Sequence, residues 1–346
     1  MRFVRPVPVV GRPTVSVVVP CYNYGRYLPQ LLDWVVDQPG IDVEVIIVDD
    51  ASPDGSGDRA EELAADYQRV KVIRHLTNRG HIQTYNEGLE AVTGDFVALL
   101  SADDLLPPGA LSRAAALLST HPHVGLVYGY ARSFSGEPPA PEPSVRNWTI
   151  WPGHDWMRHS ARRARNFISS PEVVMRTAAL RQVGLYDPRL PHSGDLDMWL
   201  RTAVNWDIGR VNGPDQALYR VHDSNMHLTT FAGTLVDLRE RRETFELLFS
   251  THAPQRSDIV RLRPAVRRAL AREACRDITL GRLDGIAHEE LVSLAEFAIE
   301  TDPSACGSRS VTRLRSGRNP AAAGMVRFGM KLRHHLLWRR ERRYGI

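Results

Sequence analysis

Two kinds of apolar pattern alternate along the first 130 residues of the chain. Short runs rich in β-branched residues, which are typical of buried strands, are separated by longer segments in which apolar residues recur every three or four positions, as on one face of a helix. This alternation predicts an α/β fold, with a mostly parallel sheet flanked by helices on both faces. The expected strands are residues 15–20, 43–48, 70–74, 96–100 and 124–130, and the expected helices are 27–36, 58–67, 82–92 and 110–119.

After a proline-rich loop at 135–147 the pattern becomes mixed and then helical. We expect short strands at 173–175 and 216–221, helices at 178–183 and 196–204, and then helices at 232–249, 259–278 and 288–299. These changes predict four parts of the chain. They are a loose leader at 1–12, an α/β domain at 13–227 with halves 13–130 and 131–227, a helical region at 228–300, and a linker with a basic amphipathic C-terminal helix at 301–346.

The composition is that of an ordinary globular protein, with 43% hydrophobic and 24% charged residues. The three cysteines show no C-x-x-C spacing, which argues against a disulfide framework and against a zinc site. The sequence contains no signal-peptide pattern and no apolar run of the length, about 18 residues, that a membrane-spanning helix needs. We therefore expect a cytoplasmic protein that is attached at most peripherally to a membrane.

The net charge of +4 is unevenly distributed, because residues 311–346 hold ten Arg or Lys against the single acid Glu341. Apolar residues at 325, 328, 332 and 336 have helical spacing within this basic segment. A basic amphipathic helix can lie on an anionic membrane surface, dock on the acidic remainder of its own chain, or bind nucleic acid without sequence specificity. We favour the first, at the inner face of the membrane, and expect no specific nucleic-acid partner.

Two aspartate pairs follow two of the predicted strands. Asp49 and Asp50 come at the end of the second strand, and Asp103 and Asp104 come just after the fourth. In open α/β sheets, ligands bind outside the carboxyl ends of the strands. Carboxylates there suit a hard divalent cation that is bound together with substrate phosphates. An aspartate after a strand can also simply stabilise a turn, but two such pairs favour a ligand site.

Two further features lie close to these pairs. Tyr22, just after the first strand, can stack on a nucleobase or pack against its own loop. Gly55 and Gly57 resemble the start of a dinucleotide-binding fingerprint, but Ala60 occupies the place of the third glycine. A plain turn is therefore the better interpretation of the two glycines.

Three charged or titratable residues of the second half are also candidates. Asp195 precedes a predicted helix, so it can be an N-cap or, beside a metal site, a general base. Arg220 and His222 follow a predicted strand. The guanidinium can clamp a phosphate, and the imidazole can bind a metal or a phosphate, although a single histidine usually does neither.

Taken in order, these motifs resemble those of a family 2 glycosyltransferase with the GT-A fold. The resemblance covers roughly residues 14–225 and rests on the ordered set, which is more specific than any one motif. The first half contains P-x-Y-N at 20–23, V-D-D-x-S-x-D at 48–54, N-x-G at 78–80 and 86–88, and the metal motif at 101–104 after G-D-F. The second half contains R-x-x-L-x-x-V-G-x-[YF]-D at 176–187 with one residue of extra spacing, the base motif before D-[LM]-W-L-R, and Y-R-x-H at 219–222.

The resemblance implies roles for the matching positions. Tyr22 stacks on the nucleobase, and Asp50 accepts a hydrogen bond from it. Asp103 ligates a divalent cation, Mn²⁺ or Mg²⁺, and Asp195 is the general base that deprotonates the acceptor hydroxyl. The metal-site candidates are Asp103, Asp104 and His222, and the donor-site candidates are Pro20, Tyr22, Asn23, Asp50, Gly80, Asn86, Ser101, Ala102, Asp103 and Arg220.

The chain departs from the family pattern at two places. Ser101 stands where the metal motif usually begins with Asp, and this change is expected to reduce metal affinity. Gly194 stands where the base motif usually has Glu, but Asp195 is retained. The Q-x-x-R-W motif and the transmembrane segments of processive members are absent, so the resemblance implies addition of a single sugar.

The implied activity is inverting transfer of one sugar from a nucleotide-diphosphate sugar to a hydroxyl of a glycan, a lipid-linked acceptor or a small molecule, as in polysaccharide biosynthesis. Asp50 suits the imide N–H of uracil or thymine, which favours UDP or dTDP donors. One alternative is transfer to a polyprenyl phosphate, which needs no base. The other is an inactive nucleotide-sugar-binding scaffold, which Ser101 would explain.

Overall fold

A nine-stranded sheet lies in the first of two compact units into which the chain divides. The computed structural model describes residues 1–223, 225, 233–252 and 255–316. The first unit comprises residues 1–156 and 168–223, and the second comprises 157–167 and the chain from 224 onward. The basic amphipathic helix expected from residue 325 lies outside the described residues.

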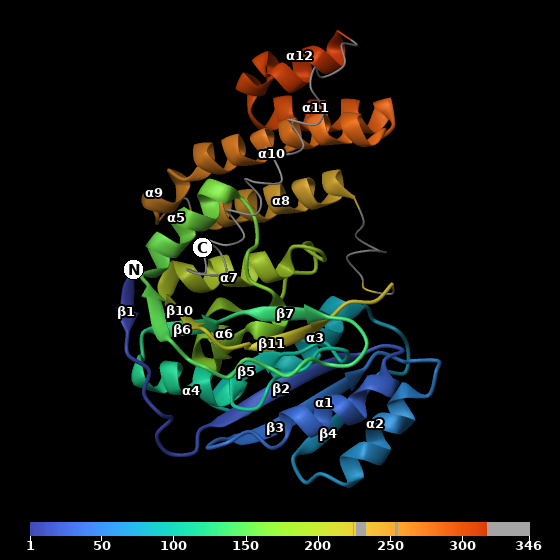
Figure 1. Cartoon of the computed structure of the whole chain (residues 1–346), viewed down its shortest axis with the longest axis vertical. Helices are drawn as coiled ribbons and strands as arrows, with labels where there is room; N and C mark the ends of the chain where they lie inside the picture. The colour runs from blue at the N-terminus through green and yellow to red at the C-terminus, as the bar shows by residue number, and fades with distance from the viewer. Residues whose placement is uncertain (224, 226–232, 253–254, 317–346) are drawn as a thin grey trace. The chain divides into compact units, whose positions relative to one another are not determined.

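Parallel pairing dominates the sheet around the buried strand β2 (Thr14–Cys21), as the sequence predicted. β2 pairs in parallel with β3 (Asp42–Asp49) and β5 (Phe96–Leu99), and β4 (Val70–Arg74) continues beyond β3. The other strands of this sheet are β1 (Arg2–Val4), β6 (Val124–Tyr128), β8 (Asn147–Trp151), β9 (Val174–Arg176) and β10 (Asp207–Asn212), in the order β1-β8-β10-β6-β9-β5-β2-β3-β4 (Figure 1).

A short two-stranded sheet stands beside the large one. β7 (Ala131–Phe134) and β11 (Ala217–Arg220) pair in parallel in it. The helices of the first unit are α1 (Leu28–Val35), α2 (Ser56–Ala65), α3 (His81–Glu90), α4 (Ala110–Thr120), α6 (Thr177–Val183) and α7 (Gly194–Asn205), with α5 (Gly153–Arg163) beginning in it and two 3-10 turns, η1 (Gly25–Tyr27) and η2 (Ser170–Glu172).

Helices cover both faces of the sheet because successive side chains of a strand point to opposite faces. Val15, Val17 and Val19 of β2 belong to the core cluster that includes the apolar faces of α1 and α4. On the other face, Gly88 of α3 packs against Val18 of β2. The predicted α/β fold is therefore confirmed, with each helix of the first half within a few residues of its expected range.

Four strands, β1, β7, β8 and β10, were not expected from the sequence. The leader is not loose throughout, because β1 pairs antiparallel with β8. β10 escaped prediction because two polar side chains, Arg210 and Asn212, interrupt its apolar pattern. Both are buried and satisfy each other, since Arg210 Nη1 donates to Asn212 Oδ1 at 2.7 Å. A buried polar pair of this kind cannot be distinguished from a surface segment by periodicity.

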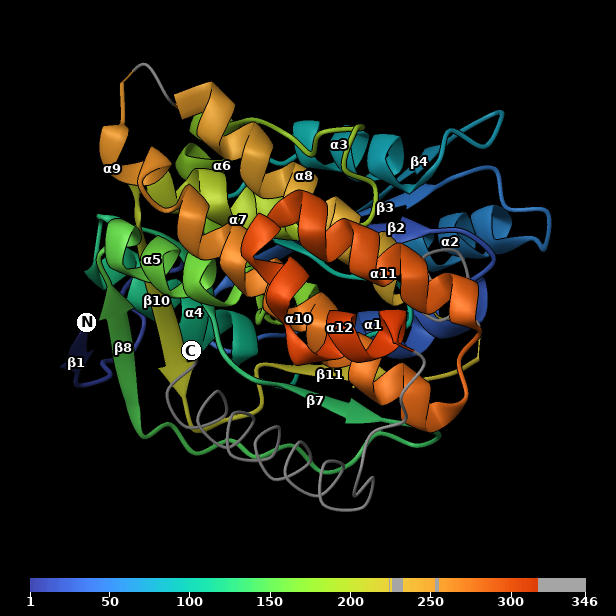
Figure 2. The same ribbon diagram turned by 90° about the horizontal axis from the view of Figure 1, so that it is seen from above.

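The second unit is helical, as expected. It contains α8 (Thr234–His252), α9 (Ser257–Val260), α10 (Arg263–Asp284) and α11 (His288–Thr301) (Figure 2). The segment expected to be a linker from 301 instead begins with η4 (Pro303–Gly307) and α12 (Arg309–Arg315). Val311 and Leu314 of α12 are buried. The sequence did not predict this short apolar face, because the arginines around it make the segment look like a polar linker. None of the helices that the structure describes has both the length and the hydropathy needed to cross a membrane.

Gly88→Ala tests how closely α3 packs on the sheet. An added Cβ would overlap the Val18 side chain and lie 3.0 Å from Val48 Cγ2. We expect the free energy of unfolding to fall by about 1–3 kcal/mol through overpacking, measured by urea denaturation. Gly307→Ala is the control, because its Cβ would meet nothing within 4 Å. Equal stability of the two variants would contradict the close packing.

Candidate active site

The donor-site candidates of the first half lie at one edge of the sheet, where β2, β3 and β5 end. The register of these parallel strands sets this arrangement, since Cys21 pairs with Asp49 and Val18 pairs with Leu99. Pro20 lies within β2, next to this edge, and Tyr22 follows directly after the strand. The Tyr22 side chain is 46% exposed although it is large and aromatic, so it is accessible to a stacking partner.

Asn23 shapes the loop after β2. Its backbone adopts a left-handed conformation, with φ of 62°, that asparagine tolerates better than most residues. Its backbone N–H donates to Ser52 Oγ at 3.0 Å, and Ser52 N–H in turn donates to Asp49 Oδ2 at 3.2 Å. The two loops that follow β2 and β3 are thus tied together, and Tyr22 extends from the first of them.

Asp50 is buried and holds the loop before α3. Its Oδ1 accepts a hydrogen bond from the Arg79 N–H at 2.7 Å, and its Oδ2 accepts one from the Gly80 N–H at 2.9 Å. His75 Nδ1 lies 2.7 Å from the same Oδ1. Gly80 has a φ of 83°, which glycine adopts without strain, so its N–H can turn toward the carboxylate. Oδ2 keeps accepting capacity beyond this bond.

The predicted metal motif forms a tight corner after β5. The Asp104 N–H donates to the Ser101 carbonyl at 3.0 Å, and Ala102 is buried inside the turn. Asp103 Oδ2 lies 2.9 Å from His222 Nε2, which comes from the loop after β11. The structure therefore brings His222 next to Asp103, 119 residues away in sequence, in the corner that Asp104 also forms. The sequence predicted all three residues at a metal site.

The electrostatics of this corner fit a divalent cation. Asp104 Oδ2 is buried and has no hydrogen-bond partner among the described residues. Burial raises the pKa of the Asp104 carboxyl well above its usual range, and the charge of Asp103 raises it further. No group of three or more Asp, Glu, His or Cys in the described part of the chain forms a complete metal site. Two protein ligands are enough for an ion whose other ligands come from a substrate diphosphate.

Arg220 braces the same corner from β11. Its backbone N–H donates to Asp104 Oδ1 at 2.8 Å, and its Nε donates to the Asp103 carbonyl at 2.8 Å. Its Nη2 donates to Gln30 Oε1 at 2.6 Å, and the guanidinium lies over the rings of Tyr27 and Phe134. In the structure the Arg220 guanidinium thus contacts groups of the protein, whereas the sequence led us to expect that it would bind a phosphate.

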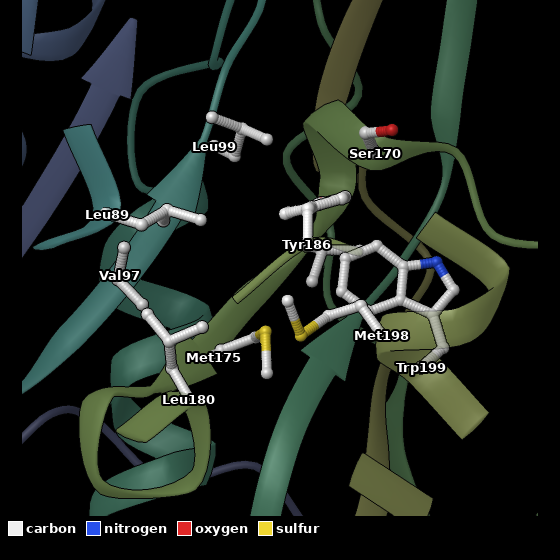
Figure 3. Close-up of a pocket in the computed structure, with 10 residues that line it drawn as sticks. Leu89, Val97, Leu99, Ser170, Met175, Leu180, Tyr186, Met198 and Trp199 are labelled. Atoms are coloured by element: carbon white, nitrogen blue, oxygen red, sulfur yellow. The ribbon is translucent and has the colours of Figure 1, made fainter. Parts of the chain in front are cut away.

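Asp195 lies in the first turn of α7 and accepts hydrogen bonds from two hydroxyl groups. Ser170 Oγ donates to its Oδ2, and Tyr186 Oη donates to its Oδ1 at 2.8 Å. Ser170 and Tyr186 also line a small apolar pocket with Met175, Met198 and Trp199 (Figure 3). Burial raises the pKa of the Asp195 carboxyl, and the two hydroxyl groups offset part of this rise. A carboxylate with a raised pKa is a stronger base.

Tyr85 of α3 is influenced by Asp195 and by the Asp103–Asp104 corner. Burial raises its pKa, and the charges of Asp195, Asp103 and Asp104 all raise it further. Its ring also meets that of Tyr186, the hydrogen-bond donor to Asp195, with centroids 5.5 Å apart.

Asn86, the next residue of α3, contacts the backbone of Tyr186, the tyrosine that donates to Asp195. Its Nδ2 donates to the Tyr186 carbonyl at 2.9 Å, and its Oδ1 accepts from the Tyr186 N–H at 2.9 Å. These contacts could not be expected from the sequence, because the motif that includes Tyr186 implies no role for the tyrosine. Ser170 was also missed, although Ser169 and Glu172 beside it form a capping box that the S-x-x-E spacing announces.

Comparisons with known proteins identify the family of the chain. The model of the family described as Glycosyl transferase family 2 matches residues 16–184. EpsE of Bacillus subtilis, which is named as a glycosyltransferase, is 30% identical over 226 residues, or 62% of this chain and 74% of EpsE. Other relatives named as glycosyltransferases match over shorter segments, for example 28% of EpsH and 47% of a PGL/p-HBAD biosynthesis glycosyltransferase of Mycobacterium bovis.

Two solved structures share the fold at low sequence identity. The mannosyltransferase PcManGT of Pyrobaculum calidifontis, in complex with GDP-Man and Mn²⁺, is 19% identical with a TM-score of 0.58, over 96% of this chain and 87% of that one. Residues 1–349 of TarS of S. aureus, in complex with UDP-GlcNAc, are 19% identical with a TM-score of 0.60, over 88% of this chain and 87% of that one. The chain is therefore an enzyme of glycosyl transferase family 2 and has the GT-A fold.

Proposed function

We propose that this enzyme transfers a single sugar from a nucleotide-diphosphate sugar to an acceptor hydroxyl, with inversion at the anomeric carbon. One observation carries the proposal. Asp195 accepts hydrogen bonds from Ser170 and Tyr186, and Tyr85, whose ring contacts that of Tyr186, is near enough to be affected by the charges of Asp195 and of the Asp103–Asp104 corner. A base on one side and a diphosphate-binding corner on the other are what an in-line displacement requires.

The residues divide the reaction between them. Tyr22 stacks on the nucleobase, and Oδ2 of Asp50 accepts the imide N–H of a uracil or thymine, which favours UDP or dTDP donors. Asp103 and His222, with Asp104 beside them, would hold a divalent cation, which would offset the negative charge that develops on the leaving diphosphate. Asp195 takes the proton of the acceptor hydroxyl as the hydroxyl oxygen attacks. Attack opposite the leaving group inverts the anomeric carbon.

Two donor classes are represented among the structural neighbours, since one binds GDP-Man and the other UDP-GlcNAc. Asp50 supports the UDP or dTDP class, because its carboxylate can only accept hydrogen bonds when ionised and a uracil or thymine imide donates one. The acceptor is a glycan, a lipid-linked sugar or a small molecule. Transfer to a polyprenyl phosphate fits less well, because an anionic acceptor has no need of Asp195.

Ser101 favours a second candidate, a nucleotide-sugar-binding scaffold without turnover. Serine replaces a carboxylate of the metal motif, and its carbonyl serves the turn through the Asp104 N–H. The retained Asp103 and Asp195 support catalysis instead, and the two candidates differ in whether bound donor is turned over.

Isothermal titration with UDP-GlcNAc, UDP-glucose, dTDP-glucose and GDP-mannose, with and without Mn²⁺, tests the donor site. We expect UDP or dTDP sugars to bind, and to bind more tightly with Mn²⁺. Asp103→Asn should lower affinity in Mn²⁺ by about tenfold or more, because it removes a charged ligand. Asp66→Asn, at an exposed position after α2, is the matched control and should change nothing. Folded protein that binds none of the four sugars would refute the proposed donor site.

Asp195→Asn tests the base. Release of nucleoside diphosphate from the sugar that binds, with water or added glycans as acceptors, should fall by about 10²–10⁴-fold, because an amide cannot take the proton. Donor affinity should stay within twofold, roughly, since Asp195 faces the acceptor side. Unchanged release in this variant would exclude Asp195 as the base. Donor binding without release in the unmodified protein would support the scaffold.

A further inference from the structure

We propose that Tyr186 and Ser170 are positioning residues for Asp195, and that Asn86 acts with them by fixing Tyr186. The proposal rests on the proposed role of Asp195 as the base. It assigns Asn86 to the base side of the site, whereas the sequence motif had placed it among the donor-binding residues.

The hydrogen bonds of Asp195 do not serve its own helix. The N-cap of α7 is Ser193, and the hydrogen bonds of the Asp195 carboxylate in the described structure come from side chains of two other segments. An aspartate in a first helical turn that acts as a cap would accept a backbone N–H instead. Occupation of one oxygen by Ser170 and of the other by Tyr186 fixes the plane of the carboxylate. The remaining lone pairs then have a defined direction toward an acceptor hydroxyl.

Tyr186 is held as firmly as the carboxylate it serves. Its side chain is 5% exposed, and its ring meets that of Tyr85 edge-on, with centroids 5.5 Å apart. Burial and the charge of Asp195 raise the pKa of Tyr186 well above its usual value. Its hydroxyl therefore stays protonated and donates to Asp195 over the whole pH range of an assay.

Asn86 fixes the backbone of the same tyrosine. Its side-chain amide bonds to both the N–H and the carbonyl of Tyr186, 100 residues away in sequence, at 2.9 Å each. Two bonds to one residue control both the position and the tilt of its peptide units. Gly88, two residues further along α3, packs against the sheet. The bonds between Asn86 and Tyr186 therefore fix the position of Tyr186, and so of Asp195, relative to the sheet.

The other titratable groups near Asp195 set the electrostatic background. His81, at the start of α3, and His192, before α7, lower the pKa of Asp195, while burial raises it. Tyr85 also faces Asp195 and, like Tyr186, remains protonated because its pKa is raised. Hydroxyl groups that donate to a carboxylate stabilise its charged form and so lower its pKa. Removing either hydroxyl must raise the pKa of Asp195.

The pH dependence of turnover separates positioning from a structural role. Activity rises with pH as Asp195 loses its proton, so a higher pKa moves this acid limb to higher pH. In Tyr186→Phe we expect the acid limb of kcat/KM for nucleoside diphosphate release to move up by about one pH unit. Ser170→Ala should move it in the same direction, and the double variant should move it further. Tyr67→Phe, on a tyrosine after α2 in the other half of the unit, is the control and should leave the limb in place.

Two outcomes overturn this assignment. An unchanged acid limb in Tyr186→Phe, with normal circular dichroism and donor affinity, would leave the tyrosine with packing alone. An acid limb that moves to lower pH would show that the Tyr186 hydroxyl does not lower the pKa of Asp195, which would contradict the proposal. The underlying proposal fails separately, because turnover that survives in Asp195→Asn would remove the base itself.

Asn86→Ala distinguishes the base side from the donor side. We expect kcat to fall by about tenfold, because Tyr186 loses both backbone restraints, while the Kd for the UDP sugar measured by titration stays within about twofold. A donor Kd that rises tenfold with unchanged kcat would return Asn86 to the donor site and overturn its assignment. If the variant fails to fold, Asn86→Asp is the second test, since it keeps the acceptor for the Tyr186 N–H and loses only the donor.

Discussion

The organisation of the site follows from one physical constraint, the cost of burying carboxylates at the edge of the sheet. A buried charge must be paired or hydrogen bonded, or its pKa shifts. Asp50 receives two backbone N–H groups and a histidine, Asp195 receives two hydroxyl groups, and Asp104 receives one backbone N–H. The three degrees of compensation match three tasks. The well-compensated Asp50 holds a loop, the partly compensated Asp195 has the raised pKa that suits the proposed base, and the under-compensated Asp104 keeps one oxygen without a hydrogen bond in the described structure, which suits the proposed cation.

Helix α3 connects the segments that hold these aspartates. Its Gly88 allows the helix to lie directly on β2 and β3, at a distance that a larger residue would prevent. Its N-terminus begins after Gly80, which Asp50 holds, and its middle carries Asn86, which holds Tyr186. The loop that Asp50 holds and the proposed base Asp195 are therefore connected through one short helix, although their residues lie in different halves of the sequence. β9, which is antiparallel to β5 and β6, connects the two halves within the sheet itself.

The sequence predicted the parallel half of the fold well, because β2, β3 and β5 are buried on both faces and appear as continuous apolar runs. It failed at β10, where Arg210 and Asn212 are buried as a hydrogen-bonded pair, and at β1, whose three residues are too few to show a period. For the site, the order of motifs led to Asp103, Asp195 and His222. The donors to Asp195 could not be foreseen, because Ser170 lies 25 residues away and its contact depends on tertiary structure alone.

The serine of the metal motif is consistent with the same constraint. Asp104 already has a raised pKa because it is buried beside the charge of Asp103. A third carboxylate at position 101, whose carbonyl accepts the Asp104 N–H, would add repulsion to a corner that Arg220 supports from the protein side. Two carboxylates balance the charge of one divalent ion, and a diphosphate brings further negative charge. At the proposed donor site, Ser101 would therefore limit the negative charge of the corner, at the expense of one ligand to the cation.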